Sequence, residues 1–393
     1  MVKLFLVFLR LGATSFGGPV AHLGYFRDEF VERRGWLTEP AYADLVALCQ
    51  FLPGPASSQV VIGIGLARGG VPGAVVASLG FTLPSMLLMI GFGYGLLGLT
   101  GAGADAAWIQ SLKVVAAAVV AQAVWQMSKS LCPDRLRASI ALGAATLLVL
   151  WSGSVMQVIA IIAGGLIGWR FCRVELPAAH DPLPIAVGRR TAVVMLIAFA
   201  VLLALALLPR GTVPIPGFEL FAAMYGSGAL VFGGGHVVLP LLEAETVRTG
   251  WVSSEAFLAG YGAAQALPGP LFTFAAFLGT VQEPSPSGWL GALLATAAIF
   301  LPSFLLVFGI LPFWLGLRRN RAARRALAGV NAAVVGLLLA ALYDPVFTGA
   351  IQSATDMALA LVAFALLHLW RIPAWLLVVA AGGGTALIGA VEP

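Results

Sequence analysis

Residues 14–22 read T-S-F-G-G-P-V-A-H, and residues 229–236 read A-L-V-F-G-G-G-H. Each stretch places a glycine cluster inside a long apolar segment. Glycine weakens a helix and permits backbone conformations that other residues avoid. Because the pattern occurs twice, about half a chain length apart, it indicates two related regions that each contain an interrupted helix.

The composition around these motifs is that of an integral membrane protein. Of 393 residues, 60% are hydrophobic and only 10% are charged, and the mean hydropathy is +0.98. An ordinary soluble domain has roughly 25% charged residues. A helix crosses a bilayer with about 20 apolar residues, and several stretches are long enough, including 71–97, 289–315, 326–342 and 372–390. They lack the polar–apolar alternation of a transmembrane β-strand, so we predict an all-α polytopic membrane protein.

The glycine motifs belong to an internal repeat. In the first half the order is G-G at 17–18, W at 36, Q at 50, P-G-P at 53–55 and L-P-S at 83–85; in the second half it is G-G at 233–234, W at 251, Q at 265, P-G-P at 268–270 and L-P-S at 301–303. Corresponding residues stay 215 to 218 positions apart. We therefore divide the chain into a first membrane repeat (1–170), a basic linker with a connecting transmembrane helix (171–217) and a second membrane repeat (218–393).

Basic residues alternate between the loops of the two repeats. The loop at 318–325 carries five arginines, whereas its counterpart, T-G-A-G-A-D-A from residue 100, has no basic residue. The next loop reverses this, with Lys129, Arg135 and Arg137 in the first repeat and Y-D-P at 343–345 in the second. Basic loops favour the cytoplasmic side, so we expect an inverted-topology repeat. A connecting helix near residues 192–208 would supply the inversion.

The same charge rule bears on the glycine segments. If they spanned the membrane, Arg27, Arg33 and Arg34 would lie outside, whereas hairpins that enter and return on one side keep all three inside. We therefore expect re-entrant hairpins with the F-G-G and P-G-P motifs at their tips. Acidic residues at 28, 29 and 32 weaken this signal, and spanning broken helices are the alternative.

Interrupted helices at membrane depth predict a binding site. Non-helical backbone is tolerated there only where protein or a watery cavity satisfies its polar groups, and free N–H groups at a helix N-terminus suit an anion. We expect the four interruptions to converge near the middle of the membrane. The candidate substrate-binding residues are Gly17, Gly18, Pro19, His22, Pro53, Gly54, Pro55, Ser57, Ser58, Gln59, Lys113, Gly233, Gly234, Gly235, His236, Gln265, Pro268, Gly269 and Pro270.

Each kind of candidate also has a structural interpretation. Glycines let membrane helices pack closely, and Gln50 and Gln265 could bridge helices. Lys113 could extend to the membrane surface, and the two histidines could be hydrogen-bonded structural residues.

The two repeats also differ at equivalent positions. Pro19 corresponds to Gly235, and S-S-Q at 57–59 corresponds to F-T-F at 272–274. We therefore expect the cavity to be more polar on the side of the first repeat.

Enzyme chemistry finds little support. The sequence has no G-x-x-x-x-G-K-[ST], H-E-x-x-H or G-x-S-x-G motif, and Cys49, Cys132 and Cys172 are not grouped with histidines at metal-binding spacing. We expect no catalytic activity, cofactor, metal site or nucleic-acid partner. The scarcity of acidic residues in the apolar segments argues against a cation pathway and favours an anion.

Taken together, these motifs resemble the chromate ion transporter (CHR) family in its long two-domain form. The matching segments include L-G-A-T-S-F-G-G-P-V-A-H and F-L-P-G-P-A-S-S-Q in the first half, and L-V-F-G-G-G-H-V-V-L-P-L-L and Q-A-L-P-G-P-L-F in the second. The resemblance implies a secondary transporter that exports chromate across the bacterial inner membrane and confers chromate resistance. Sulfate, another tetrahedral dianion, would compete or exchange.

Three questions stay open at the level of sequence. The transported anion could be sulfate or a related oxyanion, and a passive anion channel is an alternative to a transporter driven by proton-motive force or anion exchange. A homodimer is compatible with the sequence but is not indicated by it.

Overall fold

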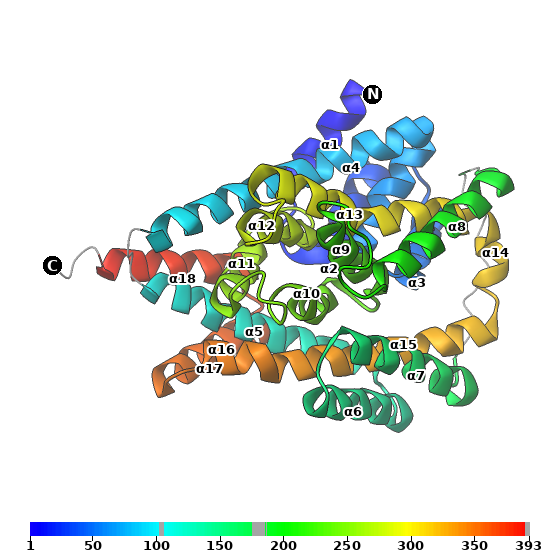
Figure 1. Ribbon diagram of the computed structural model, residues 1–393. Coiled ribbons are helices and arrows are strands. Elements are labelled where there is room, and N and C mark those ends of the chain that lie inside the picture. Colours follow the sequence, from blue (N-terminus) through cyan, green and yellow to red (C-terminus); the bar gives the residue numbers. More distant parts are fainter. Residues whose placement is uncertain (102–105, 175–184, 186, 390–393) are drawn as a thin grey trace.

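The structure is a computed structural model that describes residues 1–101, 106–174, 185 and 187–389 (Figure 1). All regular elements in these ranges are helical, which confirms the all-α prediction. Six of the described helices are long and apolar enough to cross a membrane: Ala56–Gly98, Trp108–Leu131, Ser154–Phe171, Arg189–Ala206, Gly288–Leu317 and Arg321–Ala350.

The helices follow the same order in both halves. The first half contains α1 (Val2–Thr14), α2 (Gly18–Arg27), the π-helical turn η1 (Asp28–Arg33), α3 (Glu39–Phe51), α4 (Ala56–Gly101), α5 (Ala106–Leu131), α6 (Arg135–Leu150) and α7 (Ser154–Phe171). The connecting helix predicted near 192–208 is α8 (Arg189–Ala206). The second half contains α9 (Phe218–Leu230), η2 (Gly235–Val237), α10 (Val238–Thr246), α11 (Ser254–Ala266), η3 (Leu271–Thr273), α12 (Phe274–Val281), α13 (Gly288–Ile310), η4 (Leu311–Phe313), α14 (Trp314–Leu317), α15 (Arg321–Ala341), η5 (Leu342–Phe347), α16 (Thr348–Ala350), α17 (Ala354–His368) and α18 (Ala374–Gly389).

The first two interruptions are the tips of helical hairpins, the geometry that the prediction of re-entrant segments requires. The rings of Phe8 and Phe30 lie 5.1 Å apart, although a continuous helix would separate these positions by about 33 Å at 1.5 Å per residue. Arg68 stacks over Trp36 at 4.8 Å, so the end of the second hairpin lies beside the bend between α2 and α3. The chain therefore turns back at both tips, as the loop charges predict.

The second repeat forms the same hairpins. The Glu283 N–H donates to the Trp251 carbonyl at 3.0 Å, and Arg210 stacks over the Trp251 ring at 5.0 Å. The loop before α9, the bend after α10 and the segment after α12 thus lie together. All four glycine and Pro-Gly-Pro motifs are at hairpin tips.

Acidic and basic residues form ion pairs at the bends of these hairpins, which is why acidic residues accompany the arginines in these loops. Glu29 pairs with Arg34 at 2.6 Å and with Arg33 at 3.0 Å, and Glu243 pairs with Arg248 at 3.1 Å in the second repeat. Glu29 and Glu243 are thus partners of basic residues, and they hold the turn that follows each short helix.

The repeats cross the molecule in opposite directions. Near the end of α4, the Tyr94 hydroxyl accepts a hydrogen bond from the Trp289 N–H at the start of α13, the helix equivalent to the second part of α4. Arg137, after α5, lines the same cavity as Arg324, which lies in the first turn of α15. We name the end with these arginines the basic end and the end with Tyr94 and Trp289 the far end. The first-repeat hairpins enter from the basic end, and the second-repeat hairpins enter from the far end.

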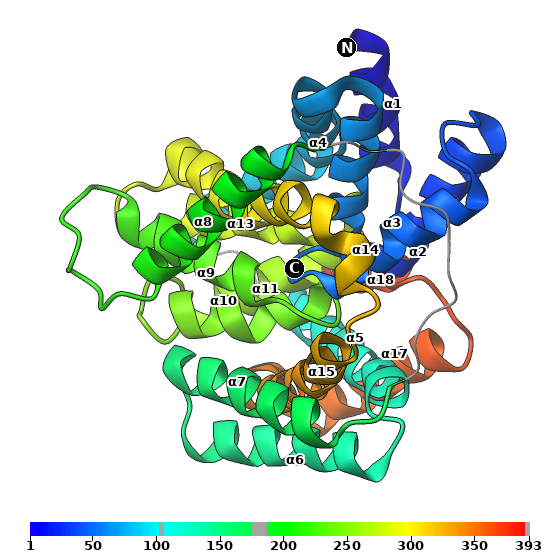
Figure 2. The same ribbon diagram turned by 90° about the vertical axis from the view of Figure 1, so that its right-hand side faces the viewer.

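The helices form two blocks (Figure 2). The hairpin block contains α1–α4 and α8–α14, and the bundle block contains α5–α7 and α15–α17. Within the bundle block, α15 of the second repeat packs on α6 and α7 of the first, and α5 packs on α17. Each block therefore contains equivalent parts of both repeats.

Close glycine contacts define the helix pairs of both repeats. Gly12 of α1 lies against the backbone of Phe81, and the equivalent Gly228 of α9 lies against the backbone of Ile299. In the bundle block, Gly329 of α15 lies against the backbone of Gly164 in α7. A side chain at these positions would overlap the neighbouring backbone, so small residues fix these helix crossings.

Candidate functional site

The four hairpin tips meet through two backbone hydrogen bonds that join the repeats. The Gly54 N–H donates to the Val231 carbonyl at 2.7 Å, and the Gly269 N–H donates to the Ser15 carbonyl at 2.9 Å. Each Pro-Gly-Pro tip is thus bound to the F-G-G segment of the other repeat. Both central glycines have positive φ, 116° and 92°, which other residues rarely adopt. The expected convergence of the interruptions is observed.

The two F-G-G tips also touch, at the position where their sequences differ. A Cβ atom on Gly235 would lie 3.1 Å from Cγ of Pro19. The ring of Pro19 therefore leaves little space for a side chain on Gly235. The two repeats thus differ at the point where the equivalent tips face each other.

A polar cavity of about 540 Å³ lies beside these tips, between the two blocks; we name it the tip cavity. The first repeat contributes Gly17 and Gly18, and the second contributes His236 and Gln265. The remaining polar lining comes from Gln122, Gln126, His368 and Arg371.

The tip cavity presents hydrogen-bond donors. Gly18 begins α2 without a side-chain cap, so the first N–H groups of that helix have no intrahelical acceptor. Within the described residues, no atom beyond the local backbone lies within 4 Å of a Cβ placed on Gly18, and Gln265 Nε2 is buried without a hydrogen-bond partner. A helix N-terminus and an unpartnered amide N–H are groups that bind oxyanions.

An oriented imidazole, His236, and a guanidinium, Arg371, lie in the same cavity as these donors. His236 Nδ1 is 2.8 Å from the Tyr261 hydroxyl, a hydrogen bond that fixes the imidazole at the cavity wall. Arg371 is exposed and supplies a positive charge at the loop between α17 and α18. That loop lies toward the basic end, because Gln110 binds the Ala350 carbonyl and Gln122 binds the Leu367 carbonyl, so α17 runs in the same direction as α5.

Several candidates lie behind the tips, outside the tip cavity. His22 is buried and its Nε2–H donates to the Ser15 carbonyl at 3.1 Å, so it supports the first tip from within the hairpin. Gln59 is also buried and donates from Nε2 to the Pro53 carbonyl at 2.6 Å. Ser57 is buried, and Ser58 lines an apolar cavity between α4, α8 and α13.

We expected residues 57–59 to make the cavity more polar on the side of the first repeat, and this contribution is not observed. The S-S-Q segment at 57–59 does not line the tip cavity, because its residues are turned into the first-repeat hairpins. The prolines at 53, 55, 268 and 270 shape the tips but do not line the cavity, and Gly233 and Gly234 lie beside Met127 of α5. Lys113 is buried in α5, also away from the tip cavity.

Four polar lining residues were missed by sequence reasoning. Gln122 and Gln126 are one helical turn apart in an otherwise apolar stretch of α5, and this spacing is a signal that could have identified them. His368 is the last residue of α17, and Arg371 lies in the loop that follows it. The sequence offers no comparable pattern at these positions.

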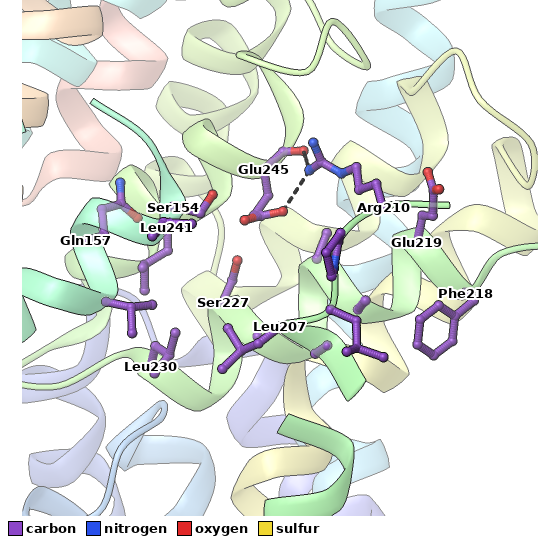
Figure 3. Close-up of a pocket in the computed structure, with 18 of the residues that line it drawn as sticks. Ser154, Gln157, Leu207, Arg210, Phe218, Glu219, Ser227, Leu230, Leu241 and Glu245 are labelled. Atoms are coloured by element: carbon purple, nitrogen blue, oxygen red, sulfur yellow. Dashed lines mark hydrogen bonds and ion pairs between the residues drawn. The ribbon is translucent and has the colours of Figure 1, made fainter. Parts of the chain in front are cut away.

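Another cavity, of about 360 Å³, approaches the tips from the far end (Figure 3). Its outer part holds an ion pair between Arg210 and Glu245, at 2.7 Å. Ser227 lies deeper, and its buried hydroxyl has no hydrogen-bond partner among the described residues. The cavity reaches Leu230, the last residue of α9 before the second F-G-G tip.

Comparison with known proteins supports one family. The family model described as "Chromate transporter" matches residues 2–169 and again residues 218–387. The "Chromate transport protein" of Pseudomonas aeruginosa is 29% identical over 98% of this chain and 91% of its own length. The protein of the same name from Cupriavidus metallidurans is 30% identical over 99% of this chain and 92% of its own length.

A third relative widens the range of organisms. An uncharacterised transporter of Methanocaldococcus jannaschii is 26% identical over 86% of this chain and 83% of its own length. No solved structure matches the chain. Because the family model covers both repeats and the relatives align over nearly the whole chain, this multi-pass membrane protein belongs to the chromate transporter family, in its long two-repeat form.

Proposed function

We propose that the protein is a secondary transporter that exports chromate across the bacterial inner membrane by exposing the tip cavity alternately to the two sides. The observation that carries this proposal is the meeting of four helix interruptions from two inverted repeats beside a cavity with unpartnered N–H donors. Inverted repeats with discontinuous helices at the midplane are the common architecture of secondary transporters.

The chemistry of the cavity supports a tetrahedral oxyanion. Its donors are backbone N–H groups, the amide of Gln265 and the guanidinium of Arg371, and within the described residues its lining includes no carboxylate. Two relatives bear the name chromate transport protein, which makes chromate the first substrate to test. Sulfate has the same shape and charge, so we expect it to compete.

The charge distribution supports export. The basic end carries the arginines at 318–325 as well as Lys129, Arg135 and Arg137, and basic loops favour the cytoplasm. Arg371 is exposed and lines the tip cavity, and the loop that carries it lies toward the same end. A chromate ion would therefore enter from the cytoplasm.

The test is chromate uptake into inside-out membrane vesicles that contain the protein. We expect radiolabelled chromate to accumulate against its own gradient when a proton gradient or a counter-gradient of sulfate is imposed. Movement only down the electrochemical gradient of chromate would identify a passive channel. Transport of sulfate without chromate would assign the cavity to another oxyanion, and no transport by folded protein would refute the proposal.

A further inference from the structure

A second polar cavity lies between the two blocks at the basic end; we name it the basic cavity. Its volume is about 360 Å³, with α3 and α14 on one side and the ends of α5 and α15 on the other. Its polar lining comprises Asp44, Gln50, Ser130, Arg137, Arg318, Arg324 and Asn331. Three arginines against one aspartate leave a formal charge of +2 on the lining side chains.

Two of the three arginines have carboxylate partners. Arg318 Nη1 lies 2.6 Å from Asp44 Oδ1, and both side chains are almost fully buried. The Trp314 indole N–H donates to the same oxygen at 3.1 Å, so the three residues form a fixed wall. Arg137 pairs with Asp134 at 2.6 Å.

Arg324 differs from both. It is half-buried, its Nε is buried without a hydrogen-bond partner, and it makes no ion pair with any described carboxylate. A partly desolvated guanidinium without a counter-ion is costly in a membrane protein and marks a site for an anion. Its planar set of N–H donors matches two oxygens of a tetrahedral oxyanion.

The inner end of the basic cavity reaches the second F-G-G tip. Asn331 Oδ1 lies 3.6 Å from the position that a Cβ on Gly233 would take. On the other side of this tip, the cavity in Figure 3 begins at Leu230. Two cavities therefore approach one tip from opposite ends of the molecule.

The charged lining is specific to one repeat. At the equivalent positions of the other repeat, Asp44 is replaced by Ala259, Arg324 by Ile109 and Asn331 by Ala116. These residues are therefore not part of the common repeat framework. They supply charged and polar groups only to the interface at the basic end.

We infer that the basic cavity is an oxyanion-binding vestibule, separate from the tip cavity, in which Arg324 makes the charge contact with a tetrahedral dianion. The Asp44–Arg318–Trp314 cluster is the positioning wall of this site. The inference rests on the proposed function, because the anion bound here would be the one that continues to the hairpin tips.

A thiol-protection experiment tests the vestibule without using transport. In the full chain with Cys49→Ala, Cys132→Ser and Cys172→Ala, a single reporter thiol is introduced either by Ala328→Cys, in the basic cavity, or by Ala123→Cys, in the tip cavity. Labelling by the neutral reagent N-ethylmaleimide is followed with sulfate or with chloride at matched ionic strength. Sulfate is the probe because chromate oxidises thiols.

The labelling rate should fall by the factor 1 + [L]/Kd, which is about tenfold at a sulfate concentration near ten times its dissociation constant. We expect this protection with Ala328→Cys, its loss when Arg324→Gln is added, and its retention when the exposed neighbour Arg319→Gln is added instead. Protection of the Ala123→Cys thiol should survive Arg324→Gln.

Three results would overturn the vestibule: an Ala328→Cys thiol that does not react, a reaction that sulfate does not slow, or protection that survives Arg324→Gln. Any of these, combined with chromate accumulation in vesicles, removes the vestibule and leaves the proposed function intact. If sulfate protects the thiol in a manner that depends on Arg324, but neither chromate nor sulfate is transported, the anion site is supported and the proposed transport function is refuted.

Discussion

The contact between α11 and α5 and the space between α3 and α15 are equivalent in the two repeats, yet one is closed and the other is open. Gly262 of α11 touches the backbone of α5, where a Cβ would lie 2.7 Å from the Leu112 carbonyl oxygen. The equivalent Ala47 of α3 is exposed and lines the basic cavity, as does Leu327, which corresponds to Leu112. One repeated interface thus adopts two arrangements within a single molecule.

This difference teaches how an inverted repeat can serve transport. Because the repeats face opposite ends, exchange of the two arrangements would close the basic end and open the far end while the hairpin tips keep their place. Lys113 is equivalent to Ala328, which lines the basic cavity, and is buried at the closed interface. The same exchange would bring Lys113 to an open surface at the far end.

The largest expected effect concerns the wall of the open interface. Asp44→Ala takes away the carboxylate that faces the buried guanidinium of Arg318, and we expect the free energy of unfolding to fall by about 3 kcal/mol. Denaturant unfolding in detergent measures this change. Adding Arg318→Met should restore most of the loss, and an Asp44→Ala protein as stable as the wild type would show that the pair does not hold the wall.

The closed interface predicts a smaller effect and supplies its own control. Gly262→Leu forces a side chain into the backbone of α5 and should destabilise the protein by about 1–3 kcal/mol. Ala47→Leu, at the equivalent open position, should change stability by less than about 0.5 kcal/mol. Thermal unfolding of both variants measures the difference, and equal effects would show that the two interfaces do not differ.

The two equivalent glutamines predict the smallest effect. Gln265 has an unpartnered amide in the tip cavity, whereas Gln50 lies at the exposed edge of the basic cavity. Loss of one hydrogen bond to a charged ligand costs about 1.5 kcal/mol, so Gln265→Leu should raise the KM for chromate about tenfold. Gln50→Leu should raise it less than about threefold, as measured in the vesicle assay. A larger effect of Gln50→Leu would move the main binding site to the basic cavity.

The architecture was largely predictable because its signals are local in sequence. Repeated glycine and proline motifs mark the hairpin tips, and arginines in the loops report which end of the molecule they occupy. These features depend on backbone conformation and on loop charge, and neither requires knowledge of helix packing. The hairpins and the inversion follow from them.

The composition of the cavities was less predictable. Residues near a tip can face a cavity or the interior of the hairpin, and helices that are apolar all round give no periodicity that reveals their rotation. His22 and Gln59 therefore could not be separated from Gln265 by sequence, although they lie behind the tips. Arg371 and Arg324 enter cavities because α17 and α15 pack with helices of the other repeat. That exchange of partners has no signature in either repeat alone.

The most direct test of alternating exposure is a disulfide across the open interface. Ala47→Cys and Leu327→Cys, in a chain with the native cysteines replaced, line opposite walls of the basic cavity, at positions equivalent to Gly262 and Leu112. We predict that oxidation in membranes during sulfate exchange joins the two cysteines in a disulfide and stops chromate uptake. A reductant should restore chromate uptake. Uptake at the wild-type rate with no disulfide formed would contradict the exchange of the two interfaces.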